Sequence, residues 1–187
     1  MQIDLSKYIT QQTVCVSRNT STMSPVMEKI SDLVSSINEK LNQLKSEIYD
    51  ALSAREILGS TAIAHGLALP HCRIPYISDF IMELRKSIYG ERNCRTLYIS
   101  DFIMGIIVVP DGIACGALDR KACRVFVFTI APQNNSNEYL KIMAELGSFL
   151  DSDEKIDKLA KAKNNVDLYD IFLKLWEEYL HQNMENL

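Results

Sequence analysis

The stretch Arg55-Glu56-Ile57-Leu58-Gly59-Ser60-Thr61-Ala62-Ile63-Ala64-His65-Gly66-Leu67-Ala68-Leu69-Pro70-His71 carries most of the information in this sequence of 187 residues. Its pattern predicts a helix end, a glycine turn and two short apolar strands, with a second turn at His65-Gly66. If the strands pair as a hairpin, His71 at the end of the second strand returns to the level of Ser60-Thr61 and Arg55. The sequence therefore predicts an imidazole beside a guanidinium and two hydroxyls.

This combination of side chains suits a site that handles a phosphoryl group. The imidazole of histidine has a nucleophilic nitrogen near neutral pH, and arginine offers a planar fork of donors to phosphate oxygens. Histidine can also carry a covalent intermediate. Two structural alternatives stay open at this point. His71 can be a surface or core histidine that ends a strand, and Arg55 can serve only the helix dipole and solvent.

The same stretch closely resembles a known family. Its Arg-Glu-x-Leu-Gly-Ser-Thr start and Pro-His end are similar to the phosphohistidine segment of enzyme IIA domains of the fructose–mannitol class. These domains belong to the bacterial sugar phosphotransferase system and include the nitrogen-regulatory type. Further matching segments follow in the family's order, and the resemblance extends from about Leu5 to Leu180. These segments are Gly112-Ile113, Gly116–Asp119, Val125–Pro132 and Asn137–Ile142.

The resemblance implies roles for particular residues. His71 would accept a phosphoryl group from the phosphohistidine of an HPr-like carrier protein and pass it on, toward sugar uptake or within a regulatory relay. Arg55 would lie near that group, with Ser60, Thr61 and Tyr139 as further candidates for contact with its oxygens. Many family members carry a second histidine where this chain has Tyr139. A phenol can still donate one hydrogen bond, but it cannot become cationic.

Each supporting residue also has a structural alternative. Ser60 and Thr61 can satisfy the backbone of a turn, as serine and threonine often do. Tyr139 can be an aromatic residue packed at the edge of the core. Glu56 is expected to be a solvated charge or a partner for Arg55.

Other roles for the histidines are weaker. A zinc site built from His71, Cys72 and Cys94 matches no common ligand spacing, and the resemblance implies neither a metal nor an organic cofactor. A hydrolase that uses His71 and Cys115 lacks an acidic residue at a motif spacing. His65 occupies a turn position where family members usually carry asparagine. A single extended strand would hold His65 roughly 20 Å from His71, so the two are not expected to share a phosphate.

The leading interpretation is a cytoplasmic enzyme IIA phosphocarrier that receives its phosphoryl group from an HPr-like protein and passes it to a IIB protein or a regulatory target. The alternative is a regulatory interaction module that is controlled by its phosphorylation state, without onward sugar transfer. Docking would need an apolar surface around His71. The candidates for this surface are Leu67, Ile74, Pro75, Tyr76 and the duplicated segment at residues 76–82 and 98–104.

The composition excludes several classes of protein. A formal net charge of −4 and the lack of a basic cluster interleaved with aromatics argue against nucleic-acid binding. The longest apolar runs, Phe102–Pro110 and Val125–Pro132, are too short to insert across a membrane, and no signal peptide is expected. The five cysteines include no Cys-x-x-Cys pair, and their odd number fits a reducing environment better than a disulfide framework. They are Cys15, Cys72, Cys94, Cys115 and Cys123.

The order of the expected elements predicts an α/β fold. It is a single domain of residues 1–187, a sandwich in which helices cover both faces of a mixed sheet. Ser24 is expected to cap the first helix, with Pro25 at its first position. Apolar spacing predicts strands at Thr13–Ser17, Gly105–Val109 and Arg124–Ala131, and further helices at Leu41–Ile57, Asn135–Leu150, Asp153–Ala162 and Val166–Leu180.

A repeat interrupts this pattern. Tyr76–Met82 recurs unchanged as Tyr98–Met104, and a chance match of seven residues is very improbable. Removing residues 83–104 joins Met82 to Gly105 and restores a spacing close to the family's. We therefore interpret residues 83–104 as a tandem-duplication insert in the loop after the phosphorylation segment. Only one copy can fill the original strand position, and a long surface insertion costs little closure entropy.

Overall fold

The centre of the molecule is a mixed β-sheet. The structure is a computed structural model that describes residues 3–37, 39–75, 77–78, 81, 102–133 and 136–185. Within these residues the sheet has five strands in the order β1-β4-β5-β2, and β3 also pairs with β5. β1 is parallel to β4, β2 and β3 are parallel to β5, and β4 and β5 are antiparallel. The strands are β1 (Ile9–Val16), β2 (Leu67–Ala68), β3 (His71–Ile74), β4 (Ile103–Ile113) and β5 (Cys123–Pro132).

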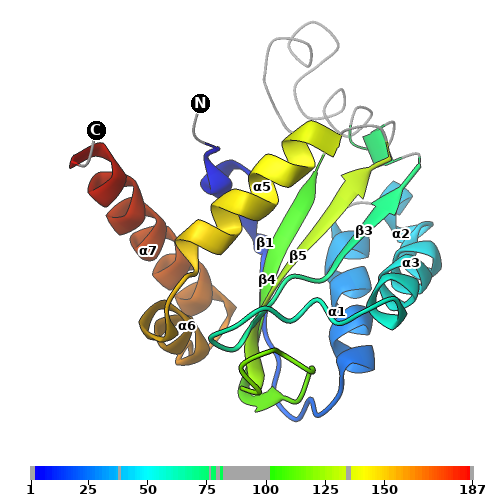
Figure 1. Cartoon of the computed structure of the whole chain (residues 1–187). Coiled ribbons are helices and arrows are strands. Elements are labelled where there is room, and N and C mark those ends of the chain that lie inside the picture. Colours follow the sequence, from blue (N-terminus) through cyan, green and yellow to red (C-terminus); the bar gives the residue numbers. More distant parts are fainter. Residues whose placement is uncertain are drawn as a thin grey trace, which may run out of the picture.

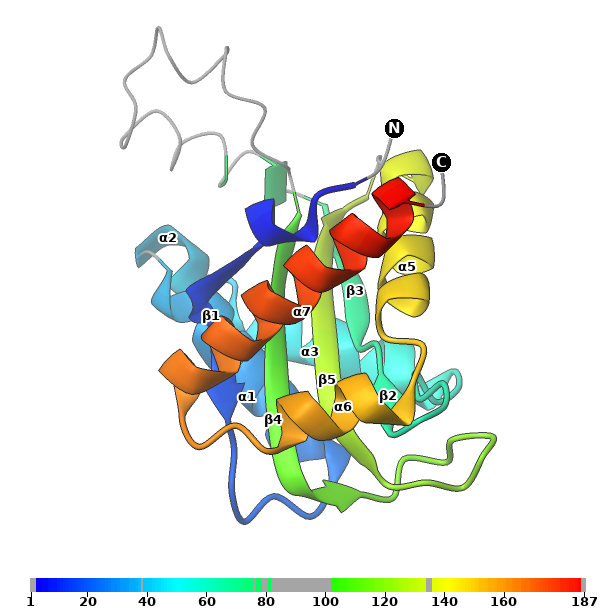
Figure 2. The same cartoon turned by 90° about the vertical axis from the view of Figure 1, so that its left-hand side faces the viewer.

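Helices cover both faces of this sheet, which confirms the predicted α/β sandwich. α1 and α3 lie against one face, whereas α5, α6 and α7 lie against the other (Figures 1 and 2). The bounds of the helices are η1 (Leu5–Lys7), α1 (Met23–Ser36), α2 (Glu39–Asn42), α3 (Lys45–Ile57), α5 (Ser136–Phe149), α6 (Asp153–Ala160) and α7 (Asn165–Glu185).

The two central strands are apolar on both sides because both sides are buried. In β4, Ile106 and Val108 join the core beneath α5–α7, whereas Ile107 and Val109 join the core beneath α1–α3. Successive side chains of a strand point to opposite faces, so one strand serves both cores. This explains why the predicted strands at residues 105–109 and 124–131 show continuous apolar runs rather than alternation.

β1 begins at Ile9, four residues before the predicted start. The strand consists of two parts that both pair with β4, and a bulge separates them. The register with β4 shifts between Ile9 and Val14. At the shift, the Thr13 hydroxyl donates to the carbonyl of Thr10 and accepts from its amide, both at 3.0 Å. A Cβ at Gly105 would overlap the Thr13 carbonyl oxygen, so the glycine admits this close approach.

The first helix is capped differently from the prediction. α1 starts at Met23 with Thr22 at the cap position, and Pro25 is its third residue rather than its first. The Ser24 hydroxyl instead shares a hydrogen bond of 2.9 Å with the Tyr49 hydroxyl on α3. Pro25 is tolerated because the amides of the first turn have no partner within the helix.

The predicted helix at residues 41–57 is divided into α2 and α3. The amide of Leu44 donates to the carbonyl of Leu41, a tight turn that precedes the first residue of α3. Both leucines are buried in the core beneath α1–α3. Their spacing fits a continuous helix as well as a turn, so the apolar pattern alone did not reveal the break.

The repeat lies partly within the described residues, and each copy contributes to the core. Phe102 is buried, and Ile103 and Met104 begin β4, where Met104 pairs with Ile9 and Thr129. The second copy therefore fills the strand position. In the first copy, Ile77 and Ile81 are buried beneath α1–α3. The remainder of the predicted insert, residues 83–101, lies outside the described part of the chain.

Deleting residues 83–104 is expected to leave a folded protein that still accepts phosphate. Removing residues 76–97 instead gives the same sequence, so one heptapeptide remains to fill the start of β4. The core then loses Ile77 and Ile81, which lowers the thermal midpoint, because each buried isoleucine contributes about 1.5–3 kcal/mol. Thermal unfolding and phosphorylation of the deletion variant test this expectation.

The matched control is the full-length Ile77→Ala/Ile81→Ala variant. It should lose a similar amount of thermal stability. An unfolded deletion variant beside a folded double variant would show that residues 83–104 have become essential to the fold.

Candidate functional site

A tight turn brings the predicted site together. His65 and Gly66 both have positive φ angles, 59° and 82°, as the two central residues of a type I′ turn require. The Leu67 amide donates to the carbonyl of Ala64 at 2.9 Å, and the Ile63 amide donates to the carbonyl of Leu67 at 2.9 Å. The predicted turn at residues 65–66 is therefore confirmed, and His65 is a turn residue.

The strands around this turn differ from the predicted hairpin. The segment before the turn makes one antiparallel bridge, between Ala62 and Ala68, and β2 is only two residues long. The prediction that His71 ends a strand is wrong, because His71 is the first residue of β3. Pro70 lacks an amide hydrogen, but its carbonyl accepts from the Thr129 amide at 3.0 Å. The chain then continues along β5 in a new strand.

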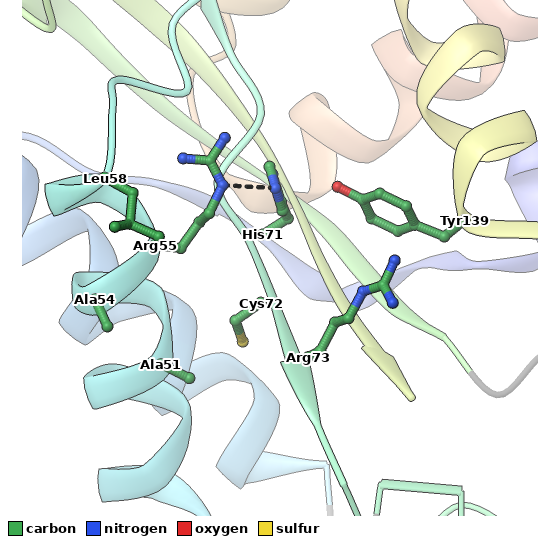
Figure 3. A pocket seen from close by; sticks show the side chains of 8 residues that line it. All are labelled: Ala51, Ala54, Arg55, Leu58, His71, Cys72, Arg73 and Tyr139. Carbon is green, nitrogen blue, oxygen red and sulfur yellow. Dashed lines mark hydrogen bonds between the residues drawn. The ribbon is translucent and has the colours of Figure 1, made fainter. Parts of the chain in front are cut away.

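His71 and Arg55 are in direct contact, as the sequence predicted. Arg55 Nε donates to His71 Nε2 at 2.9 Å (Figure 3). On the other side of the ring, His71 Nδ1 lies 2.9 Å from the carbonyl oxygen of Leu69. A guanidinium can only donate and a carbonyl can only accept. The proton must therefore be on Nδ1, and the Nε2 lone pair of a neutral imidazole faces Arg55.

The environment of His71 keeps its ring neutral. Burial lowers the pKa of His71 below its ordinary value, and the positive charges of Arg55 and Arg73 act in the same direction. The Leu69 carbonyl partly opposes this shift, because it stabilises a protonated ring. The neutral, nucleophilic form of His71 is thus favoured at neutral pH.

Arg55 is fixed at the end of α3 by a second contact. Its Nη1 donates to the carbonyl of Gly59 at 2.8 Å while its Nε faces His71. The guanidinium lies in the last turn of the helix, where its positive charge also interacts favourably with the helix dipole. Arg55 can therefore both lie near the phosphoryl group and serve the helix dipole, so the two interpretations from the sequence are compatible.

Tyr139 lies on the opposite side of His71 from Arg55. The ring centroids of His71 and Tyr139 are 5.5 Å apart, and the phenol oxygen points toward the imidazole (Figure 3). Burial raises the pKa of Tyr139, so the hydroxyl keeps its proton and can donate. Tyr139 is buried and also belongs to the core beneath α5–α7, so it combines both roles that the sequence suggested.

Arg73 is a site residue that the sequence analysis missed. Its guanidinium carbon lies 5.2 Å from the centroid of the Tyr139 ring, and its Nη1 donates to the Gln133 carbonyl at 3.3 Å. Residues two apart on a strand share a face, so the position of Arg73 after His71 was a usable signal. The guanidinium groups of Arg55 and Arg73 therefore both lie near the imidazole of His71.

These side chains line an open hollow of about 360 Å³, which is large enough for a phosphoryl group. Within the described residues its lining combines two arginines, one histidine and one tyrosine with four small or apolar side chains. The lining residues are Ala51, Ala54, Arg55, Leu58, His71, Cys72, Arg73 and Tyr139.

Ser60 and Thr61 do not belong to this lining as the described residues define it. The Ser60 hydroxyl donates to the carbonyl of Cys115. The Thr61 hydroxyl donates to Glu56 Oε2 at 2.7 Å, and its amide donates to the same carboxylate. The prediction for Glu56 is therefore corrected: it holds the Thr61 turn. A phosphate contact from either hydroxyl stays a prediction.

The expected docking surface also needs correction. Leu67 and Ile74 are only 2% and 1% exposed because β2 and β3 place them in the core, so they cannot contact a partner. Pro75 is exposed, and Tyr76 lies outside the described residues. Exposed apolar side chains instead lie at the end of helix α3, where its last residue, Ile57, is 84% exposed and the following residue, Leu58, which lines the hollow, is 85% exposed.

Neither weaker alternative has all of its residues gathered within the described part of the chain. Among the described residues no group of three or more metal-ligating side chains gathers, and Cys94 of the imagined zinc site lies outside them. Burial raises the pKa of Cys72 to about 12, so its thiol is inert at neutral pH. Cys115 does not line the hollow that holds His71. His65 instead faces Asp153, with 3.1 Å between Nδ1 and Oδ1.

The fold and the site define an α/β sandwich protein organised around a neutral histidine beside two arginines. The chain belongs to the family described as phosphoenolpyruvate-dependent sugar phosphotransferase system, EIIA 2, whose model matches residues 7–175. A curated relative, the nitrogen regulatory protein of Pseudomonas aeruginosa, is 24% identical over 147 residues, which are 78% of this chain and 79% of the relative. The family that the sequence motif suggested is thus confirmed, and its members are phosphotransfer components.

Solved structures show the same fold. The nitrogen regulatory protein IIA-Ntr of Neisseria meningitidis aligns with a TM-score of 0.64 and 18% identity, over 89% of this chain and 97% of its own. The mannitol IIA protein of Escherichia coli aligns with a TM-score of 0.59 and 17% identity, over the same shares. A complex of E. coli mannitol IIA with phosphorylated mannitol IIB aligns with a TM-score of 0.60 and 16% identity, over 89% of this chain and 95% of its own.

Among the described residues, no helix is both long and apolar enough to cross a bilayer.

Proposed function

We propose that this chain is a cytoplasmic phosphocarrier in which Nε2 of His71 takes a phosphoryl group from the phosphohistidine of an HPr-like donor. The observation that carries the proposal is the pairing of the imidazole: Nδ1 holds the proton against the Leu69 carbonyl, and Nε2 keeps its lone pair, which accepts from Arg55, beside the open hollow that both residues line. A fixed tautomer directs the reaction to one nitrogen.

The transfer exchanges one P–N bond for another. Nε2 of His71 forms a bond to phosphorus as the bond between phosphorus and the donor's histidine breaks, so no water or metal is consumed. His71 becomes positively charged, and its Nδ1–H bond to Leu69 strengthens because the donor group is then cationic. Arg55 must turn from Nε2 toward the incoming oxygens, while its anchor at the Gly59 carbonyl keeps it close.

The surroundings fit a protein partner. Ile57 and Leu58 at the end of α3 and Leu140 on α5 are exposed apolar residues, and the two helices carry Arg55 and Tyr139, which flank His71. Exposed apolar side chains that gather beside a site mark surfaces for protein interaction. We therefore assign the docking surface to Ile57, Leu58 and Leu140.

The acceptor is a IIB protein or a regulatory target. The complex of mannitol IIA with phosphorylated mannitol IIB favours the first, and the nitrogen regulatory relative favours the second. In the second case the chain acts as an interaction module whose partner binding depends on phosphorylation, without onward sugar transfer.

One experiment tests the proposal in two stages. The chain is incubated with an HPr protein carrying labelled phosphohistidine, and acid-labile phosphate is mapped by peptide analysis. Label on His71 supports the carrier, and label elsewhere or none contradicts it. Adding a IIB protein then separates the two roles, because a carrier loses its label to IIB and a pure module keeps it.

Replacing Tyr139 should alter the phosphorylated state modestly. A phenol hydrogen bond contributes about 0.5–1.5 kcal/mol, so Tyr139→Phe is expected to shorten the lifetime of the phosphohistidine by no more than about tenfold. Tyr139→His should retain phosphorylation and add a pH dependence between about 6 and 7 in the transfer rate. Rate–pH profiles of the unaltered protein, Tyr139→Phe and Tyr139→His test both expectations. Superimposable profiles would show that Tyr139 is only a packing residue.

The pH dependence of acceptance should follow the lowered pKa of His71. Protonation removes the Nε2 lone pair, so acceptance is retained above the ordinary histidine pKa of about 6.5 and is lost only as the pH falls below it. NMR titration of the His71 imidazole in the unphosphorylated protein measures this directly. A midpoint at or above about 6.5 would contradict the expected shift.

A further inference from the structure

The side of His71 opposite Arg55 holds a second guanidinium that has no assigned role so far. Arg73 shares β3 with His71, and side chains two residues apart on a strand point to the same face. The imidazole lies between Arg55 on one side and the Tyr139 ring with Arg73 on the other (Figure 3). Both arginines line the same hollow. Arg73 is therefore placed to act on a group that His71 carries.

Two contacts direct the guanidinium of Arg73. Its carbon lies 5.2 Å from the centroid of the Tyr139 ring, within the range of about 6 Å in which a cation is attracted to an aromatic face. Its Nη1 donates to the Gln133 carbonyl at 3.3 Å, which is long beside the usual length of about 2.9–3.0 Å. The guanidinium can therefore exchange this carbonyl for a stronger acceptor while the ring keeps it near His71.

The hollow needs a second positive charge when it holds a phosphoryl group. Such a group carries about 1.5–2 negative charges and three acceptor oxygens. Arg55 supplies one positive charge, and Tyr139 cannot supply another because a phenol does not become cationic. Among the described residues no carboxylate lines the hollow, so nothing there competes with the phosphoryl oxygens for Arg73.

The imidazole already responds to this charge. Burial is the main cause that lowers the pKa of His71, and the positive charges of Arg55 and Arg73 lower it further. A charge that acts on the protonation of the ring also acts on an anionic group bonded to that ring.

We propose that Arg73 is a second ligand of the phosphoryl group on His71, and that the Tyr139 ring positions it. When the group arrives at Nε2 of His71, the guanidinium of Arg73 exchanges the Gln133 carbonyl for a phosphoryl oxygen and stays against the ring. No covalent bond to Arg73 forms or breaks. This role rests on the proposed function, because it begins only when His71 is phosphorylated.

The test compares Arg73→Gln with Arg18→Gln as the matched control. Both arginines are exposed and donate to a backbone carbonyl, but Arg18 donates to Lys163 at 3.2 Å and does not line the hollow. The measurement is the equilibrium constant for phosphoryl transfer from a phosphorylated HPr protein. We expect Arg73→Gln to lower it by about three- to tenfold, since solvent weakens an exposed ion pair, and Arg18→Gln to leave it unchanged. Arg73→Lys keeps the charge but loses the planar fork, so it should recover only part of the loss.

The outcomes separate this role from the proposed function. Absence of label on His71 in the unaltered protein would contradict the proposed function, and this role with it. Normal labelling with an unchanged equilibrium constant in Arg73→Gln would overturn the role of Arg73 alone. An equal decrease in Arg18→Gln would do the same, because it would show an effect of net charge rather than of position.

Phosphorus NMR tests the contact directly. The resonance of the phosphohistidine should shift in Arg73→Gln and stay in place in Arg18→Gln, because only the first variant loses a donor to the phosphoryl oxygens. An unchanged resonance in Arg73→Gln would overturn direct contact.

A final comparison tests the positioning by Tyr139. Tyr139→Phe and Tyr139→Leu both lack the hydroxyl, but only Tyr139→Phe keeps the ring. With Arg73 present, we expect Tyr139→Leu to have an equilibrium constant about threefold lower than that of Tyr139→Phe, and in the Arg73→Gln background the difference should vanish. If Tyr139→Leu proves unfolded in a thermal scan, Tyr139→Met removes the ring with a more adaptable side chain. The same difference in both backgrounds would overturn the positioning role of the ring.

Discussion

His71→Ala is expected to abolish acid-labile phosphorylation while leaving the fold intact. Removing the imidazole removes Nε2, the atom that would form the bond to phosphorus, and no residual covalent transfer is expected. The side chain is only half-buried and begins a strand whose backbone pairs with β5, so its loss costs about 1 kcal/mol of stability. Labelling with a phosphorylated HPr protein and thermal unfolding measure the two effects separately.

His65→Asn is the matched control for this variant. His65 occupies a turn position with a φ of 59°, which asparagine also tolerates, and it contacts Asp153 rather than the hollow. The control should keep most of its phosphorylation. Equal loss in both variants would remove His71 from its assigned role.

The motif around residues 55–71 predicted which side chains meet but not the backbone that brings them together. Spacing placed Arg55 beside His71 correctly, because a turn at residues 65–66 reverses the chain. The strand boundaries were wrong because Pro70 interrupts the ladder, and β5 then provides a second partner for the chain from His71 onward. That partner lies more than fifty residues away in sequence, so local patterns contain no information about it.

Interior packing explains the other differences. The apolar spacing of residues 41–57 does not distinguish a continuous helix from α2 and α3, since Leu41 and Leu44 are buried in either case. The early start of β1 was hidden by polar residues, because Thr10 and Thr13 bond to one another at a bulge. In β1 the pairing with β4 outweighs the local pattern, and in residues 41–57 the burial of both leucines leaves that pattern ambiguous.

The roles of the hydroxyls and of Arg73 could not be read from spacing alone. Ser60 and Thr61 adjoin the site in sequence, yet their side chains turn toward Cys115 and Glu56. Arg73 was overlooked because the motif ends at His71, although the alternation of a strand places both on one face. Side-chain direction is decided by the partners that the fold supplies.

Replacing Arg55 is expected to have the second-largest effect on phosphoryl transfer, after His71→Ala. Its planar group donates in two directions, from Nε to His71 and from Nη1 to the Gly59 carbonyl. A hydrogen bond to a charged group contributes about 1.5–3 kcal/mol, so Arg55→Ala should slow acceptance by about 10- to 150-fold. Arg55→Lys keeps the charge but loses the fork, and we expect it to slow acceptance by roughly tenfold. Single-turnover rates with a phosphorylated HPr protein measure both.

Two further readouts distinguish a role in transfer from a role in folding. The thermal midpoint should change little, because a charge at a helix end contributes only about 0.3–1 kcal/mol. The charge of Arg55 is one of the causes that lower the pKa of His71, so Arg55→Ala should raise that pKa in an NMR titration, whereas Arg55→Lys should raise it less. A normal transfer rate in Arg55→Ala would remove Arg55 from the site. A lost rate with an unfolded protein would make Arg55 a structural residue at the end of α3 instead.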